Sequence, residues 1–204
     1  MKKIESVIFD LGGVLLDIDY NLTRSAFEKL GIVHFDDMYS QADADLLFRK
    51  LETGHISEND FYKELNRCTG LHLSDEEIRT AWNTMLLSYR EESLAFLESL
   101  RQHYKIFLLS NTNFIHLNEL NKIFNRKKRN HSFEEYFDKA FYSCEIGLRK
   151  PDRECFEWVI RNRNLNAGAT LFIDDSDQNI KMAKETGLQT IHLTPSMRIE
   201  DLGL

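Results

Sequence analysis

The sequence lacks paired cysteines, metal-type histidine spacing, long apolar runs and an excess of basic residues. Its three cysteines, Cys68, Cys144 and Cys155, are odd in number and far apart, and none forms a CxxC pair. This pattern excludes a disulfide framework and a cysteine zinc site, and it indicates reduced thiols in the cytoplasm. The seven histidines are scattered without the spacing of metal ligands. We therefore expect neither a disulfide-stapled fold nor a zinc centre.

Two further absences bear on partners and location. No apolar stretch is long enough for a signal-peptide core or a membrane span, so we expect a cytoplasmic protein with no membrane partner. Acidic residues outnumber basic ones by 33 to 26, giving a formal charge of −7. A nucleic-acid binder usually shows a basic face, and the one basic cluster, residues 126–129, lies in a polar connection typical of a solvated loop. We expect no nucleic-acid partner.

What the chain does contain is enough apolar sequence for a sizeable core. Its 204 residues are 42% hydrophobic and 29% charged, which is ordinary for a globular protein of one domain or one domain with an insertion. Nothing resembles a heptad seam, so we expect a monomer or a weak dimer.

Four short apolar runs predict buried strands, and each one leads into a polar residue. These runs and the residues that follow them are 7–9 with Asp10, 106–109 with Ser110, 140–142 with Ser143, and 171–173 with Asp174. Helical patterns over residues 114–124, 152–162 and 176–186 separate or follow the later runs. Alternating strands and helices predict an α/β fold with a doubly wound parallel sheet. Ligands bind beyond the carboxyl ends of such strands, so the polar residues are expected to converge on one crevice.

The first connection is much longer than a crossover helix needs. About 95 residues separate the first two predicted strands, and residues 18–89 have the pattern of several helices. We expect residues 18–89 to form a helical cap over the active edge of the sheet, and residues 1–17 and 90–204 to form the core.

Start and stop signals support three of the cap helices. The first ends at Gly31, the second is opened by Ser57 and followed by Gly70, and the third is opened by the capping-box pattern at residues 74–77. The third apolar face is predicted to comprise Ile78, Trp82, Met85 and Leu86. We expect the aromatic residues of the cap, Trp82 included, to lie in its core.

Asp10 is the first candidate for chemistry. It closes the first predicted strand and is followed by Leu11, Gly12 and Gly13, where the backbone can turn tightly and approach a ligand. A carboxylate in this place can act as a nucleophile that forms an aspartyl-phosphate. Aspartate and glycine are also ordinary turn residues, so this segment alone leaves both interpretations open.

The other strand ends supply complementary groups. Ser110, Asn111 and Thr112 offer polar side chains and the N–H groups at the start of a helix, which suit a phosphate oxygen but are also common caps. The adjacent carboxylates of Asp174 and Asp175 repel each other unless a cation or proton relieves them, which favours a hard divalent ion.

The last candidate for chemistry is Lys150. It stands just before a helix begun by Pro151, from where its ammonium group could reach the crevice. A lone lysine is usually a surface residue. Its position between the Ser110 and Asp174 strand ends in the chain order favours a role in the site.

These four ordered segments resemble the four motifs of the haloacid dehalogenase-like hydrolase superfamily. The resemblance covers nearly the whole chain, and the insertion is positioned like that superfamily's helical cap of the first type, in subfamily I. The resemblance implies a magnesium-dependent hydrolase in which Asp10 is the nucleophile. It further implies that the metal is bound by Asp10, by Asp175 and by the carbonyl of Gly12, with Asp174 joining through water and Asn179 orienting the acidic pair. Ser110 and Asn111 would bind the phosphoryl group, and Lys150 would neutralise its charge.

One position departs from the superfamily pattern. Most phosphatases of this superfamily carry a second aspartate two residues after the nucleophile, which protonates the leaving group, and here that position is Gly12. General acid–base catalysis is typically worth about 10²- to 10⁴-fold in rate. Asp17 and Asp19 are candidate substitutes, although they are equally placed to mark the entry to the cap.

Three hypotheses follow. The first is a phosphatase of small phosphorylated metabolites with good leaving groups, such as a sugar 1-phosphate. The segments 9–19, 52–57 and 147–151 are similar to a bacterial subgroup that contains a glucose-1-phosphate phosphatase with glycine at the same place. The second is a 2-haloacid dehalogenase, which needs no metal and is therefore disfavoured by the Asp174–Asp175 pair. The third is a catalytically weak or inactive protein that binds a phosphorylated ligand.

Overall fold

The computed structural model describes residues 3–33 and 42–204. Residues 1–2 of the predicted core and 34–41 of the predicted cap lie outside the described residues. A five-stranded parallel sheet forms the centre of the molecule, with the strand order β5–β4–β1–β6–β7. Its strands are β1 (Ser6–Phe9), β4 (Lys105–Ser110), β5 (Lys139–Tyr142), β6 (Thr170–Asp174) and β7 (Gln189–His192). The predicted doubly wound α/β fold is confirmed.

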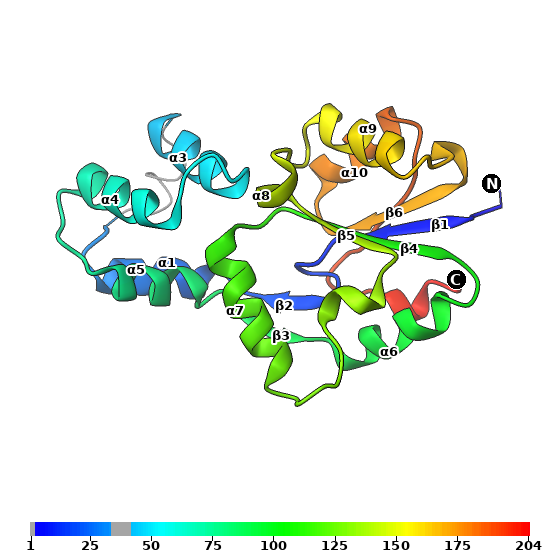
Figure 1. Ribbon diagram of the computed structural model, residues 1–204, viewed down its shortest axis with the longest axis horizontal. Coiled ribbons are helices and arrows are strands. Elements are labelled where there is room, and N and C mark those ends of the chain that lie inside the picture. Colours follow the sequence, from blue (N-terminus) through cyan, green and yellow to red (C-terminus); the bar gives the residue numbers. More distant parts are fainter. Residues whose placement is uncertain (1–2, 34–41) are drawn as a thin grey trace.

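Helices cover both faces of this sheet because strand side chains alternate between the faces. Val7 and Phe9 of β1 pack into one hydrophobic cluster with residues of α6 (Glu91–Leu100) and α7 (Phe114–Asn125). Ile8 points to the other face, into a cluster with residues of α9 (Arg153–Asn162) and α10 (Asp177–Glu185). Figure 1 shows α9 and α10 on one side of the sheet and α6 on the other. The shorter elements of this part are α8 (Ser143–Ile146), η1 (Phe133–Tyr136), η2 (Ala167–Ala169) and η3 (Ile199–Asp201).

Among the described residues, four of the helices between β1 and β4 form a helical region beside the sheet, on the left in Figure 1. They are α1 (Tyr20–Lys29), α3 (Ala42–Glu52), α4 (Glu58–Thr69) and α5 (Asp75–Asn83). Phe27, Phe48, Phe61 and Trp82 lie in one buried cluster of this region, so the expectation that Trp82 belongs to the core of the helices agrees with the structure. The division of the chain into core and cap at residues 18 and 89 stays a prediction.

The capping signals act as the sequence predicts. Ser57 Oγ accepts a hydrogen bond from the backbone N–H of Asp60, and Gly70 ends α4 in the left-handed conformation with φ of 69°. Ser74 and Glu77 form the reciprocal capping box at the start of α5. Side-chain acceptors therefore satisfy backbone donors that a helix start leaves without intrahelical partners.

The third cap helix is shorter than the apolar pattern predicts. It ends at Asn83, and Leu86 lies instead in β3 (Leu86–Tyr89), which pairs antiparallel with β2 (Leu16–Ile18). The N–H of Met85 donates to Thr23 Oγ1, and the carbonyl of Met85 accepts from Asp19. These tertiary hydrogen bonds take the place of helical ones and direct the chain into the antiparallel pair of strands β2 and β3, which we call the β2–β3 ribbon.

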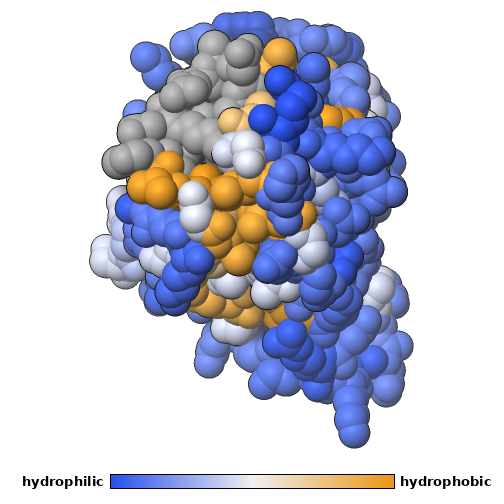
Figure 2. All heavy atoms as spheres, turned by 90° about the vertical axis from the view of Figure 1, so that its left-hand side faces the viewer, coloured by the Kyte–Doolittle hydropathy of each residue, from blue (hydrophilic) through white to orange (hydrophobic). Residues whose placement is uncertain are grey.

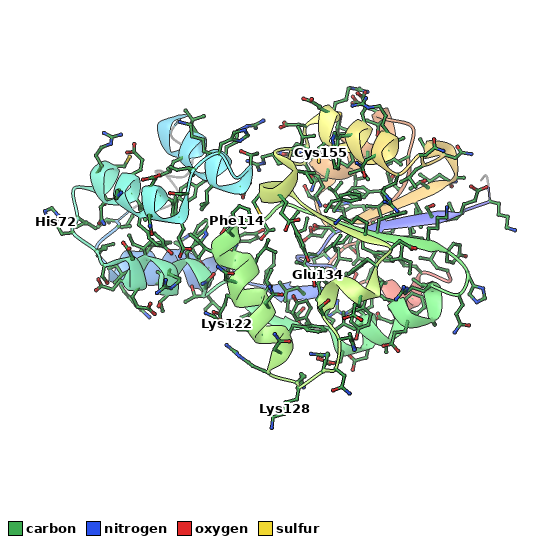
Figure 3. The ribbon with its side chains drawn as sticks, viewed as in Figure 1. His72, Phe114, Lys122, Lys128, Glu134 and Cys155 are labelled. Atoms are coloured by element: carbon green, nitrogen blue, oxygen red, sulfur yellow. The ribbon has the colours of Figure 1, made fainter. Side chains whose placement is uncertain are left out.

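The surface carries hydrophobic side chains at one end of the molecule (Figure 2) and the basic cluster at residues 126–129. Figure 2 faces the end formed by the helical region and shows hydrophobic side chains gathered there. Leu22, Val33 and Leu46 are exposed large hydrophobic residues of the chain between β1 and β4. In the basic cluster, Arg129 binds the Glu91 carboxylate, and Lys128 points away from the body of the molecule in Figure 3.

The cysteines and the helix lengths complete this picture. All three cysteines are free, and Cys155, labelled in Figure 3, is buried on α9. In the part of the chain that the structure describes, no helix has both the length and the apolar character required to span a bilayer.

Candidate active site

Three neighbouring strands bring their polar ends to one edge of the sheet. Asp10 follows β1, and Ser110 and Asp174 are the last residues of β4 and β6, the two strands that flank β1. A cavity of about 260 Å³ lies at this edge. Of the predicted site residues, those that line it are Asp10, Gly12, Ser110, Asn111, Lys150, Asp175 and Asn179, while Asp174 is fully buried beside it. The convergence expected from parallel strands is therefore present.

Lys150 lies between two carboxylates. Its Nζ donates to Asp10 Oδ1 at 2.7 Å and to Asp174 Oδ2 at 2.6 Å, and its side chain is only 1% exposed. Burial alone would lower the pKa of Lys150, but the charges of Asp10 and Asp174 outweigh it and hold the pKa above its usual range. Lys150 is therefore a fixed positive charge beside Asp10.

The carboxylates outnumber this single ammonium group. Asp10, Asp174 and Asp175 each offer an oxygen within 4.8 Å of the others, a spacing that suits a metal ion. Burial raises the pKa of Asp10 to about 7, and the neighbouring Asp174 and Asp175 charges add to the rise despite Lys150. Burial and Asp174 also raise the pKa of Asp175. The part of each shift that comes from the neighbouring carboxylates is negative charge that a divalent cation would relieve.

Glycine at position 13 leaves room for Asp175. Gly13 has φ of +70°, and a Cβ on it would lie 2.1 Å from Asp175 Oδ2. Any side chain there would be strained in its backbone and would displace the carboxylate. The absence of a side chain at Gly13 thus leaves the Asp175 carboxylate its place in the acidic cluster, and this supports the fit of a metal ion to these residues.

The two aspartates at the end of β6 have different surroundings. Asp174 accepts hydrogen bonds from the Asn179 side chain at 3.0 and 3.1 Å and from the Ser176 N–H at 2.8 Å, in addition to Lys150. Asp175 is exposed at the cavity. Asn179 therefore orients Asp174, and Asp175 has the more open position for a direct metal contact.

Asn111 is tied to the main chain of Lys150. Its Nδ2 donates to the Lys150 carbonyl at 2.7 Å, and its Oδ1 accepts from the Lys150 N–H at 2.9 Å. Close by, Ser143 Oγ accepts from the N–H of Thr112 and donates to its carbonyl. These paired bonds hold the segment after β4 against the start of α8 and against the segment that follows α8. The Asn111 side chain thus positions Lys150, and its predicted contact with a phosphoryl group stays a prediction.

Asp17 and Asp19, the candidate substitutes for the acid that is absent at Gly12, have structural partners. Asp17 accepts from Arg90 Nε at 2.7 Å, and Asp19 caps α1 by accepting from the N–H of Asn21. Neither is among the described residues that line the cavity. Their contacts agree with the alternative that they mark the entry to the helical region.

Sequence reasoning missed two residues beside the site. His116 lines the cavity from α7, and its backbone N–H donates to Asn113 Oδ1, a helix cap three residues earlier. Arg149 lines the cavity next to Lys150 and pairs with Glu52 of the helical region. The cap spacing could have located His116 on the site-facing turn of α7, whereas nothing in the local sequence links Arg149 to Glu52.

Comparison with known proteins places the chain in a family. A model of haloacid dehalogenase-like hydrolases matches residues 4–187. This match covers most of the chain, and the sheet with its acidic edge is what the resemblance implied, so the protein belongs to the haloacid dehalogenase-like hydrolases.

Its relatives include proteins named as phosphatases. It is 33% identical over 188 residues to a D-ribitol-5-phosphate phosphatase from Bacteroides thetaiotaomicron, covering 92% of this chain and 90% of that protein. It is 27% identical to a sesquiterpene phosphatase from Aspergillus oryzae, covering 95% of this chain and 91% of the other. A crystal structure of a family enzyme from Bacteroides thetaiotaomicron, in complex with magnesium and inorganic phosphate, has a TM-score of 0.89 at 33% identity and covers 98% of this chain and 100% of its own.

Proposed function

We propose that the protein is a magnesium-dependent phosphatase of small phosphorylated metabolites, with sugar or polyol phosphates as its substrate class. The observation that carries this proposal is the buried contact of Lys150 with Asp10 and Asp174 beside the open carboxylate of Asp175. This group combines a candidate nucleophile, a fixed positive charge and a set of metal-binding oxygens. The 33% identity to a D-ribitol-5-phosphate phosphatase over most of both chains supports it.

Magnesium fits the acidic cluster by the chemistry of its donors. Mg²⁺ prefers oxygen ligands and is usually held by one or two carboxylates. We assign Asp10, Asp175 and the carbonyl of Gly12 as its direct ligands, with Asp174 joining through water. When bound, the ion supplies positive charge that offsets the repulsion between a phosphate monoester and an anionic nucleophile.

Asp10 then acts as the nucleophile. A carboxylate oxygen of Asp10 bonds to phosphorus as the bond from phosphorus to the ester oxygen breaks, giving an aspartyl-phosphate and a released alcohol. Water hydrolyses the aspartyl-phosphate to inorganic phosphate and restores Asp10. Lys150 stabilises the negative charge of the transferring group, as do Ser110 and the N–H groups that follow it.

The departing alcohol has no side chain at Gly12 to give it a proton. The proton must come from water or from another group at the cavity, so substrates whose leaving group is comparatively acidic react best. A sugar 1-phosphate meets this condition through its anomeric oxygen. The similarity to a polyol phosphatase makes terminal phosphates of sugars and polyols a second set to test.

Two alternatives are weaker. A 2-haloacid dehalogenase needs no metal cluster, and the likeness to an L-2-haloacid dehalogenase, at 19% identity and a TM-score of 0.59, concerns the fold alone. A phospho-ligand binding protein without turnover would not require Asp10, Lys150, Asp174 and Asp175 together, since clustered charges are costly to bury.

One assay separates these functions. Purified protein is given sugar phosphates, polyol phosphates, 4-nitrophenyl phosphate and 2-haloacids, with and without Mg²⁺, beside an Asp10→Asn variant. We expect phosphate release that requires Mg²⁺ and falls at least about 10³-fold in the variant, because the amide is a poor nucleophile. Metal-independent halide release would identify a dehalogenase, and binding of phosphate without turnover would identify the third function.

A further inference from the structure

A second cavity of about 390 Å³ adjoins the catalytic cavity. The two share lining residues, namely Tyr20, Met85, Asn111, Thr112 and His116. The opposite side of the second cavity is formed by Thr23, Arg24, Glu52 and Trp82 of the helical region. A phosphate ester whose phosphoryl group lies at Asp10 therefore has this cavity next to it, and 390 Å³ is within the range of small-molecule sites.

Several polar residues of this cavity have structural partners. Thr23 Oγ1 bonds to the carbonyl groups of Ala81 and Trp82 and accepts from the N–H of Met85. Asn113 caps α7, and His116 Nε2 contacts the Trp82 carbonyl at 3.2 Å. These hydrogen bonds fix the side chains in the wall of the second cavity. Of the described residues that line the cavity, Arg24 and Glu52 are the charged ones.

Glu52 belongs to an ion pair that joins the two cavities. Arg149 Nη1 lies 3.2 Å from Glu52 Oε2, and the two side chains are 20% and 16% exposed. Glu52 lines the second cavity, while Arg149 lines the catalytic one and donates from Nε to the carbonyl of Lys150 at 3.3 Å. The carboxylate thus lies near the place where the ester substituent enters the second cavity, and Arg149 fixes its position relative to Lys150.

We propose that the second cavity receives the leaving group and that Glu52, oriented by Arg149, accepts hydrogen bonds from its hydroxyl groups. The substrates are then phosphate monoesters of small polyhydroxylated molecules. A polyol offers donors to the carboxylate, whereas an apolar chain such as a prenyl group would remove water from Glu52 without replacing its hydrogen bonds. This inference rests on the proposed phosphatase function and adds the residues that select the substrate.

The test compares kcat/KM for polyol and sugar phosphates of three to six carbons, farnesyl phosphate and 4-nitrophenyl phosphate, all with Mg²⁺. For the best polyol or sugar phosphate, we expect Glu52→Gln to lower its kcat/KM relative to that of 4-nitrophenyl phosphate by about 10- to 100-fold. The loss should be mainly in KM. Glu64→Gln is the matched control, because Glu64 forms an exposed ion pair with Arg67 on α4, and it should leave the ratio unchanged.

Arg149→Lys keeps the charge but not the planar geometry, and it should lower the same ratio in a protein whose melting temperature shows that it is folded. An equal loss on both substrates, or a preference of the native protein for farnesyl phosphate, would overturn the inference. Absence of Mg²⁺-dependent hydrolysis of 4-nitrophenyl phosphate would instead contradict the proposed function itself.

Discussion

Gly12 lies two residues after Asp10 and lines the catalytic cavity without contributing a side chain. A Cβ at this position would lie 2.9 Å from Cδ1 of Ile18, the far end of a flexible side chain. Its φ is not in the left-handed region that favours glycine, since Gly13 and not Gly12 has positive φ. The position can therefore accept a side chain after a small shift of Ile18.

The first prediction follows from this space. We expect Gly12→Asp to speed hydrolysis of alkyl phosphates, whose leaving groups need a proton, by up to about 10²-fold. Hydrolysis of 4-nitrophenyl phosphate should change much less, because its leaving group departs without protonation. The measurement is kcat/KM for both kinds of ester across pH 5 to 8.

Gly12→Asn is the control for this prediction. Asparagine has nearly the same size as aspartate and cannot act as a general acid at neutral pH. If both variants changed the alkyl and aryl esters alike, the effect would be one of packing against Ile18 and not of proton donation.

At the scale of single residues, the sequence predicted the reactive groups better than the residues that hold them in position. Asp10, Ser110 and Asp174 were found because each ends an apolar run. The contacts of Asn111 with Lys150 escaped prediction because they join residues 39 positions apart and leave no local pattern. Supporting hydrogen bonds of this kind depend on the tertiary fold.

Among the secondary-structure elements, α7 and α5 are joined by a buried histidine. His116 Nε2 contacts the Trp82 carbonyl, so this nitrogen carries the proton, and Nδ1 lies 3.2 Å from Asn113 Nδ2. The His116 and Trp82 rings stack with centroids 5.0 Å apart. Burial lowers the pKa of His116 to about 4, partly offset by the hydrogen bond to Trp82. The neutral ring thus links the helix after the site to the helical region.

The pKa of His116 predicts how stability depends on pH. The unfolded chain takes up a proton near pH 6.5 and the folded one near pH 4, so the contribution of His116 is complete above pH 6.5 and declines as the pH falls toward 4. The loss amounts to about 3 kcal/mol of unfolding free energy. Urea unfolding of the native protein and of His116→Gln at several pH values measures it.

The difference between the two proteins isolates this contribution. Asp10 acts in the opposite direction, because its raised pKa makes the folded state the better proton acceptor below about pH 7. That effect is common to both proteins and cancels. A difference in unfolding free energy that stays constant between pH 7 and 4 would contradict the prediction.

Prediction of elements succeeded where one periodicity dominated. The helices with clear caps, such as α4, were found at nearly their observed bounds. The ribbon strand β3 was mistaken for the end of a helix because Met85 and Leu86 continue the apolar spacing of α5. The choice between helix and strand here is made by the pairing of Leu86 with Ile18, which lies 68 residues earlier in the chain.

For the molecule as a whole, the acidic cluster couples metal binding to folding. Mg²⁺ that binds the folded protein alone should stabilise it by about 2.7 kcal/mol at 100 times its Kd. For a chain of this size that raises the melting temperature by about 5–10 °C. Thermal unfolding with increasing MgCl₂ measures the shift.

Asp175→Asn should lose most of this shift, because it removes the most open carboxylate of the cluster. Asp201→Asn, on the exposed end of η3, should retain it. Equal shifts in the two variants would show that magnesium acts elsewhere on the protein.

The β2–β3 ribbon also shortens the path by which the chain closes its central sheet. Along the sequence, β1 and β4 are separated by about 96 residues, but once Leu16 pairs with Tyr89 the connected path is about 23 residues. Because the entropy of loop closure depends on the logarithm of loop length, the shorter path lowers the free-energy cost of forming the β1–β4 contact by about 1 kcal/mol. A helical insertion of this length therefore adds little entropic barrier to the alignment of Asp10 with Ser110, because its own folding brings the two flanking segments together.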